Sequence, residues 1–253
     1  MNNDLTIVIQ GLFSQDSARK IEQYRKLTNN IVYSTWKHPS LNQLPDYVKV
    51  VSHDLPDKGN CYCCNKRMQN LIEDSTIAWA VSTTRNGIRE VQTEYTIKVR
   101  ADEYYNLEPF VEKMMENKDK VLFGNIFARK FSDHEFHMGD HIFGGKTEIF
   151  ATAYENIFDD AHNYSSKPFD KFCYNYMRNP LYGIWAAEAM LACNILKAMG
   201  LEITKENFAK RFEIIDINLM VPFLARWRHI NKVYASKFDL HRNIFSMKDM
   251  VND

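Results

Sequence analysis

Residues 5–11 read LTIVIQG, and this stretch decides the fold. The β-branched run Thr6–Ile9 is typical of a buried strand, and it ends at Gln10 and Gly11. Residues 14–28 then carry apolar side chains at helical spacing, and residues 31–36 read IVYSTW, a second run of strand type. A strand, a helix and a strand in this order predict a βαβ unit, whose two strands lie parallel in one sheet.

The alternation of strands and helices continues along the chain. Further strands are predicted at 47–51, 93–99 and 121–130, and helices at 65–88, 105–117 and 184–199. Gly200 directly follows the last of these helices, which is the usual place for a helix-ending glycine. We therefore expect an α/β protein in which helices flank a mostly parallel sheet, with a C-terminal helical subregion.

Composition and charge exclude several classes of protein. The chain has 253 residues, 45% of them hydrophobic and 25% charged, which is the profile of an ordinary globular domain. Basic and acidic residues number 32 each, so the net charge gives no general attraction to nucleic acid. No export signal or membrane-length apolar run is present, and the five cysteines are an odd number. These features predict a cytoplasmic location with free thiols.

The end of the strand predicted at 93–99 carries the most chemistry. Residues 98–103 read KVRADE, and alternation along a strand places Lys98, Arg100 and Asp102 on one face. Arg100 and Asp102 would then lie about 7 Å apart. An arginine binds phosphate through two parallel hydrogen bonds, and a carboxylate can hold Mg²⁺ or Mn²⁺ together with phosphate oxygens. The alternative is a solvated surface ion pair with no chemical role.

Two later segments are also candidates. Residues 132–141 contain three histidines and three acidic residues, which fits either a divalent-metal cluster or a polar loop. Gly144 follows them and would let a ligand approach the backbone closely. Glu188 lies in an otherwise apolar helix, where burial would raise the pKa of its carboxyl and suit it to proton transfer. A polar network in the core is the other explanation for Glu188.

Two common nucleotide-binding motifs are missing. The turn after the first strand has a single glycine, Gly11, so the G-x-G-x-x-G motif of dinucleotide enzymes is absent. No Walker A loop occurs either. A nucleotide at the carboxyl ends of these strands would therefore be held by side chains more than by a glycine-rich loop.

Several segments, taken in order, resemble the WavE family of lipopolysaccharide-synthesis proteins. They are TIVIQG at 6–11, YSTW at 33–36, NKRMQ at 65–69, YTIKVRAD at 95–102, GDHIFG at 139–144, and Glu188. The resemblance covers roughly residues 5–200 and implies one GT-A-like glycosyltransferase domain over 1–253. Its part at about 1–130 would bind the nucleotide sugar, and its part at 131–253 the acceptor.

The resemblance also implies a function. The expected reaction moves a sugar from a nucleotide-diphosphate sugar to a lipopolysaccharide or capsule glycan, with a lipid-linked or oligosaccharide acceptor. Peripheral contact with the inner membrane is a further expectation, and nucleic acid is not an expected partner. Two alternatives stay open: a nucleotidyltransferase on a similar sheet, and a non-catalytic protein that binds nucleotide sugars.

The resemblance and the positions of residues near the predicted strand ends together suggest the members of the site. The donor is expected to contact Gln10, Gly11, Ser34, Asp54, Arg67, Arg85, Lys98, Arg100 and Gly144. For an inverting reaction the base is Asp140, with Glu188 as second choice.

The GT-A pattern has Asp-x-Asp where this chain has Arg100-Ala101-Asp102. One consequence is that Asp102, with Glu103 and a late histidine such as His241, holds Mn²⁺ or Mg²⁺. The other is that Arg100 and Lys98 neutralise the leaving diphosphate without a metal.

Overall fold

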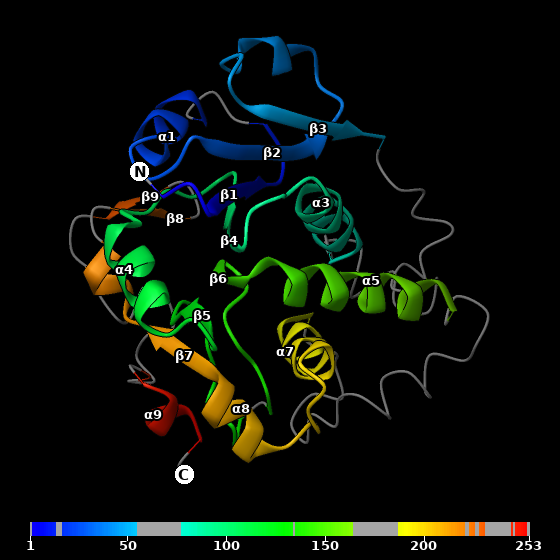
Figure 1. Ribbon diagram of the computed structural model, residues 1–253, viewed down its shortest axis with the longest axis vertical. Helices are drawn as coiled ribbons and strands as arrows, with labels where there is room; N and C mark the ends of the chain where they lie inside the picture. Colours follow the sequence, from blue (N-terminus) through cyan, green and yellow to red (C-terminus); the bar gives the residue numbers. More distant parts are fainter. Residues whose placement is uncertain are drawn as a thin grey trace.

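A seven-stranded sheet forms the centre of the molecule, with the strand order β3-β2-β1-β4-β6-β5-β7 (Figure 1). The computed structural model describes residues 2–13, 17–54, 77–133, 135–163, 187–220, 223–225, 228–230, 244 and 246–251. The strands are β1 (Leu5–Gln10), β2 (Asn30–Trp36), β3 (Lys49–His53), β4 (Tyr95–Arg100), β5 (Val121–Gly124), β6 (Ile142–Lys146) and β7 (Phe212–Ile215).

All strands of this sheet run in one direction except β6. Ile7 of β1 lies in register with Ile31 of β2 on one side and Ile97 of β4 on the other, both parallel. Strand β6 runs antiparallel to β4 and β5, with Val99 opposite Ile142. The residues just before β6 therefore reach the edge of the sheet at which β1, β2 and β4 end.

Helices cover both faces of the sheet. Helices α1 (Ser17–Tyr24) and α4 (Glu108–Glu116) lie on one face, and α3 (Ile77–Arg89), α5 (Thr147–Asn163) and α7 (Ala187–Ala198) on the other (Figure 1). Alternate residues of β1 point to opposite faces of the sheet. Ile7 and Ile9 pack in the core on the face covered by α1 and α4, and Val8 packs in the core on the other face. Burial on both faces explains why the residues of β1 do not alternate between apolar and polar.

The C-terminal part adds short elements around β7. They are α8 (Lys205–Arg211), the 3₁₀ turn η5 (Ile217–Met220), the antiparallel pair β8 (Phe223–Ala225) and β9 (Arg228–Ile230), and α9 (Met247–Val251). Helix α7 ends at Ala198, and the predicted helix-ending Gly200 lies in the turn after it with a φ of +71°. The N–H of Leu201 donates to the carbonyl of Leu196 there, which closes the last turn.

The predicted fold class, α/β with a mostly parallel sheet flanked by helices, is confirmed. Of the helix predicted at 65–88, the structure describes only the part from Ile77 onward. Among the described helices, which include one further 3₁₀ turn at Pro39–Gln43, none combines the length and apolarity needed to cross a bilayer.

Candidate functional site at the strand ends

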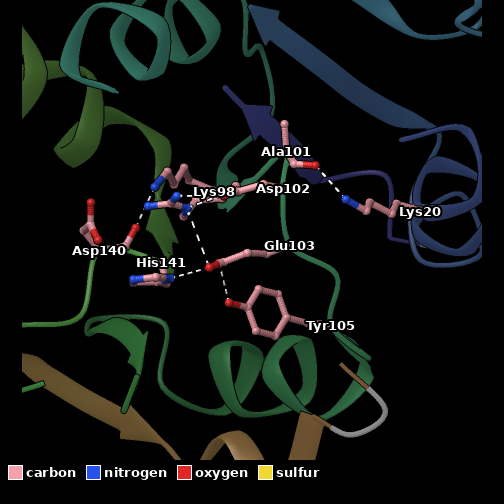
Figure 2. A network of polar contacts seen from close by, with 9 residues as sticks. Lys20, Lys98, Ala101, Asp102, Glu103, Tyr105, Asp140 and His141 are labelled. Atoms are coloured by element: carbon pink, nitrogen blue, oxygen red, sulfur yellow. Dashed lines mark hydrogen bonds and ion pairs between the residues drawn. The ribbon is translucent and has the colours of Figure 1, made fainter. Parts of the chain in front are cut away.

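Charged side chains gather where β4 ends and β6 begins (Figure 2). Arg100 is the last residue of β4, and Asp140 and His141 directly precede β6. The antiparallel pairing of Val99 with Ile142 places the two groups next to each other across the sheet. We call this cluster of Lys20, Lys98, Arg100, Asp102, Glu103, Asp140 and His141 the strand-end cluster.

Arg100 and Asp102 form a two-pronged ion pair within this cluster. Nε of Arg100 donates to Oδ1 of Asp102, and Nη2 donates to Oδ2, both at 2.9 Å. Burial alone would raise the pKa of Asp102, but the hydrogen bonds and charge of Arg100 outweigh it and lower the pKa. The two side chains remain 33% and 25% exposed, so a ligand can reach them. Arg100 and Asp102 thus pair with each other, as in the ion-pair alternative; Asp102 lies in the turn after β4, and contact of either side chain with phosphate stays a prediction.

Glu103 is the fully buried centre of the cluster. Its Oε1 contacts Nδ1 of His141 at 2.5 Å and lies 3.6 Å from Nε of Arg100. Its Oε2 accepts a 2.5 Å hydrogen bond from the hydroxyl of Tyr105. The N–H of Tyr105 in turn donates to the hydroxyl of Tyr24 on α1. Glu103 therefore connects the exposed end of β4 to the core.

His141 is held on a second side by an aromatic ring. The ring centre of Phe127 lies 4.9 Å from that of His141. Phe127 has a φ of +57°, in the left-handed region that costs a non-glycine residue about 1 kcal/mol or more. Strain of this kind persists only where surrounding contacts enforce it, so the loop is built to keep this ring against the imidazole.

Two buried lysines fix the backbone around the cluster. Lys98 donates a 2.6 Å hydrogen bond to the carbonyl of Asp140, and Lys20 donates one of 2.6 Å to the carbonyl of Ala101. Both side chains lie among the buried residues, and burial lowers the pKa of Lys98. The direct phosphate contact predicted for Lys98 stays a prediction, since its ammonium is engaged with the backbone here.

The pKa values of the two predicted bases, Asp140 and Glu188, are shifted in opposite directions. Burial opposes the charge of Asp140, but Lys98 and the other nearby cations outweigh it and lower the pKa. Burial, and next the charge of Asp140, raise the pKa of Glu188 to about 7. Glu188 lies in the first turn of α7, with Nε2 of His137 3.8 Å from its Oε2. Two carboxyl groups with such different affinities can divide the tasks of binding and proton transfer.

Three residues predicted to bind the nucleoside lie together at the ends of β1 and β2. The amide of Gln10 donates to the hydroxyl of Thr83, and the hydroxyl of Ser34 donates to the carbonyl of Thr83. Both contacts fasten α3 to the sheet. Gly11 has a φ of +127° and donates its N–H to the carbonyl of Ser34. Their contact with a nucleoside stays a prediction.

Three other residues that were predicted to contact the nucleotide sugar are not members of the strand-end cluster. Asp54 is exposed and pairs with Lys37 at 3.0 Å. Arg85 pairs with Glu155 of α5 at 2.6 Å, which joins α3 to α5. A Cβ on Gly144 would lie 2.8 Å from the ring of Phe110, so this glycine allows close packing of α4. Their roles toward a ligand, like those of the residues above, are untested.

The predicted metal site is not assembled by the described residues. Both carboxylate oxygens of Asp102 accept from Arg100, and both oxygens of Glu103 are engaged. Two histidines of the segment at 132–141 contact different acids: His137 lies near Glu188, and His141 contacts Glu103. Within the described part of the chain no three His, Cys, Asp or Glu side chains could hold an ion together. Arg67 and His241 lie outside the described residues.

Sequence reasoning gave Tyr105 and Lys20 no role, and it considered Glu103 and His141 only as possible metal ligands, without predicting their contact with each other. Glu103 directly follows Asp102 and His141 follows Asp140, so adjacency to the predicted residues was the available signal. Lys20 gave a different signal. It is a lysine on the side of a helix that also carries buried Ile21 and Tyr24.

Comparison with known proteins gives one match along most of the chain. The family profile described as WavE lipopolysaccharide synthesis matches residues 5–214, from β1 into β7. No curated protein matches. Among solved structures, the crystal structure of HddC from Yersinia pseudotuberculosis complexed with GMP-PN is 12% identical, with a TM-score of 0.36 over 59% of this chain and 79% of that chain. A second structure of HddC from Yersinia pseudotuberculosis is 10% identical, with a TM-score of 0.34 over 58% and 78%.

Proposed function

The chain belongs to the WavE lipopolysaccharide-synthesis family, and on that premise we propose that it transfers a sugar from a nucleotide-diphosphate donor to a glycan acceptor. The observation that supports this most is the strand-end cluster. Open α/β sheets bind their ligands at the carboxyl ends of parallel strands, where β1, β2 and β4 finish here. The cluster offers exposed, charged hydrogen-bond donors and acceptors at that edge.

The donor's diphosphate is proposed to lie at Arg100. Departure of a nucleoside diphosphate develops negative charge, so the site must supply donors aimed at the leaving oxygens. A guanidinium carries five N–H donors, and Asp102 uses two of them. The remaining donors are available to phosphate, while Asp102 keeps the guanidinium in position. The nucleoside would extend toward Gln10, Gly11, Ser34 and Asp54.

The acceptor is proposed to lie between Asp140 and Glu188. In an inverting transfer the acceptor oxygen attacks the anomeric carbon and loses its proton, while the bond to the diphosphate breaks. A base works best when its pKa lies near the working pH, which favours Glu188 over Asp140 for that proton. Asp140, which stays charged, suits hydrogen bonding to the acceptor hydroxyl.

A donor screen tests this function. The chain is mixed with UDP-, GDP- and dTDP-sugars and an oligosaccharide from lipopolysaccharide or capsule, and release of free nucleoside diphosphate is measured. We expect acceptor-dependent release from one nucleotide class. Release of pyrophosphate from a nucleoside triphosphate and a sugar 1-phosphate would instead favour nucleotidyl transfer. Binding is checked by the rise in melting temperature that a ligand of the folded state causes. If no nucleotide sugar raises the melting temperature, the result contradicts both activities.

A further inference from the structure

Glu103 brings a guanidinium and an imidazole to the same carboxylate oxygen. Oε1 of Glu103 lies 2.5 Å from Nδ1 of His141 and 3.6 Å from Nε of Arg100. Because Glu103 is fully buried, solvent does not screen either contact. The two groups come from β4 and from the residue before β6, and a single acid fixes their separation.

The orientation of His141 is determined on each side. An ionised carboxylate only accepts hydrogen bonds, so Nδ1 of His141 carries a hydrogen toward Glu103. Nε2 then points away from Glu103, toward the side on which Asp140 lies (Figure 2). Tyr105 holds the other oxygen of Glu103, and the Phe127 ring packs against the imidazole. A second N–H at Nε2 would therefore have a fixed direction.

The charges of the strand-end cluster suit an anion. Its basic side chains include Lys20, Lys98 and Arg100, and its acidic side chains are Asp102, Glu103 and Asp140. His141 adds a fourth basic side chain to the cluster. Because both lysines donate to backbone carbonyls, the cluster's other side-chain donors are those of Arg100, which is 33% exposed, and of His141, which is 5% exposed beside it.

We propose that Arg100 and His141, held side by side by Glu103, bind the diphosphate of the donor directly, in the place where the GT-A pattern puts a divalent cation. Glu103 is the positioning residue of this pair. The inference rests on the proposed function, because the diphosphate belongs to the sugar donor. It follows from the disagreement between the expected metal site and the residues present: the acids that would hold the ion already hold Arg100 and His141.

Calorimetry without metal tests the pair. Inorganic pyrophosphate, UDP and GDP are titrated into the wild-type chain in EDTA and again in Mn²⁺. We expect at least one of the three to bind in EDTA, with less than threefold gain from Mn²⁺. His141→Gln and Arg100→Gln should each weaken that binding about tenfold or more, the effect of losing one charged hydrogen bond. His38→Gln, an exposed histidine outside the cluster, is the matched control and should bind as the wild type does.

Two variants of Glu103 separate positioning from packing. Glu103→Gln keeps the shape but removes the charge, and Glu103→Asp keeps the charge with a shorter reach. A positioning role predicts that Asp retains more affinity than Gln, whereas a packing role predicts the reverse order. Melting temperatures show whether each variant is folded, and His141→Gln supplies the same test without changing Glu103.

Some outcomes would contradict diphosphate binding by Arg100 and His141 without contradicting the proposed sugar transfer. Binding seen only with Mn²⁺, equal binding by wild type and His141→Gln, or no binding of any probe in EDTA would each overturn the pair. Sugar transfer that needs Mn²⁺ would leave the proposed function standing and remove only this inference. Metal-free binding of UDP or GDP without any sugar transfer would support the pair and count against the proposed reaction.

Discussion

The ammonium of Lys20 donates a 2.6 Å hydrogen bond to the carbonyl oxygen of Ala101, and this bond fixes α1 to the turn between Arg100 and Asp102. Lys20→Met keeps most of the buried side chain but leaves the carbonyl without its donor. We expect the free energy of unfolding to fall by about 1–3 kcal/mol. Urea denaturation measures this loss, and an unchanged midpoint would show that the bond adds nothing.

Asp102→Ala should reduce sugar transfer by about a hundredfold or more, because Arg100 loses the acid that aims it. Asp102 is partly exposed, so the melting temperature should change by only a few degrees. Asp119→Ala is the matched control: Asp119 pairs with Arg211 at 3.2 Å and lies outside the strand-end cluster. Full activity in Asp102→Ala would remove Asp102 from the site.

Glu188 should make stability depend on pH. Its pKa is raised from 4.5 to about 7 in the folded protein, so the folded state binds the proton more tightly than the unfolded state. This contribution is fully present below pH 4.5 and is lost as the pH rises through 7, by about 3 kcal/mol at most. Denaturation of the wild type and Glu188→Gln from pH 4.5 to 8 should show the wild type losing more stability. Glu148→Gln, an exposed acid in the first turn of α5, is the control, and parallel curves for the wild type and Glu188→Gln would contradict the assignment.

The two carboxylates should differ in kinetics. Glu188→Gln is expected to lower kcat by about a hundredfold with little change in KM, because a base acts in the transition state. Asp140→Asn is expected mainly to raise KM for the acceptor. Steady-state rates at saturating donor measure both quantities, and wild-type rates in both variants would move the proton-transfer step elsewhere.

Gly144→Ala should destabilise the core. A Cβ would lie 2.8 Å from the Phe110 ring and 2.9 Å from Ile97, closer than real contacts allow, and overpacking of this kind costs about 1–3 kcal/mol. Gly200→Ala is a useful comparison: no atom lies within 4 Å of its Cβ, and its cost comes from a φ of +71°. Thermal denaturation of both variants separates packing from backbone strain, and a wild-type melting temperature for Gly144→Ala would contradict the packing described here.

The central strands were predictable because they are buried on both faces. Continuous β-branched runs predicted β1, β2 and β4 to within about two residues of their ends. The strand predicted at 121–130 is shorter: β5 ends at Gly124, where the side chain of Asn125 bonds the N–H of Ile217 and the carbonyl of Ile244. Those partners lie far along the chain, so the sequence around Asn125 does not reveal them.

The site was predictable only where its residues are neighbours in sequence. Arg100 ends β4 and Asp102 lies in the turn directly after it, so their closeness in sequence was enough to suggest that they act together. Glu103 and His141 are 38 residues apart and meet because β6 inserts next to β4 with reversed direction. That direction is a property of the whole sheet, and no local pattern in residues 132–146 encodes it.

The reversed strand also makes the strand-end cluster tolerant of changes in chain length. Paired positions from Tyr95 with Lys146 to Val99 with Ile142 clamp β6 over its full length. Extra residues inserted between Ala128 and Phe136 would bulge outward without sliding Asp140 or His141. A change in the length of this connection would therefore leave the contact between Glu103 and His141 in place.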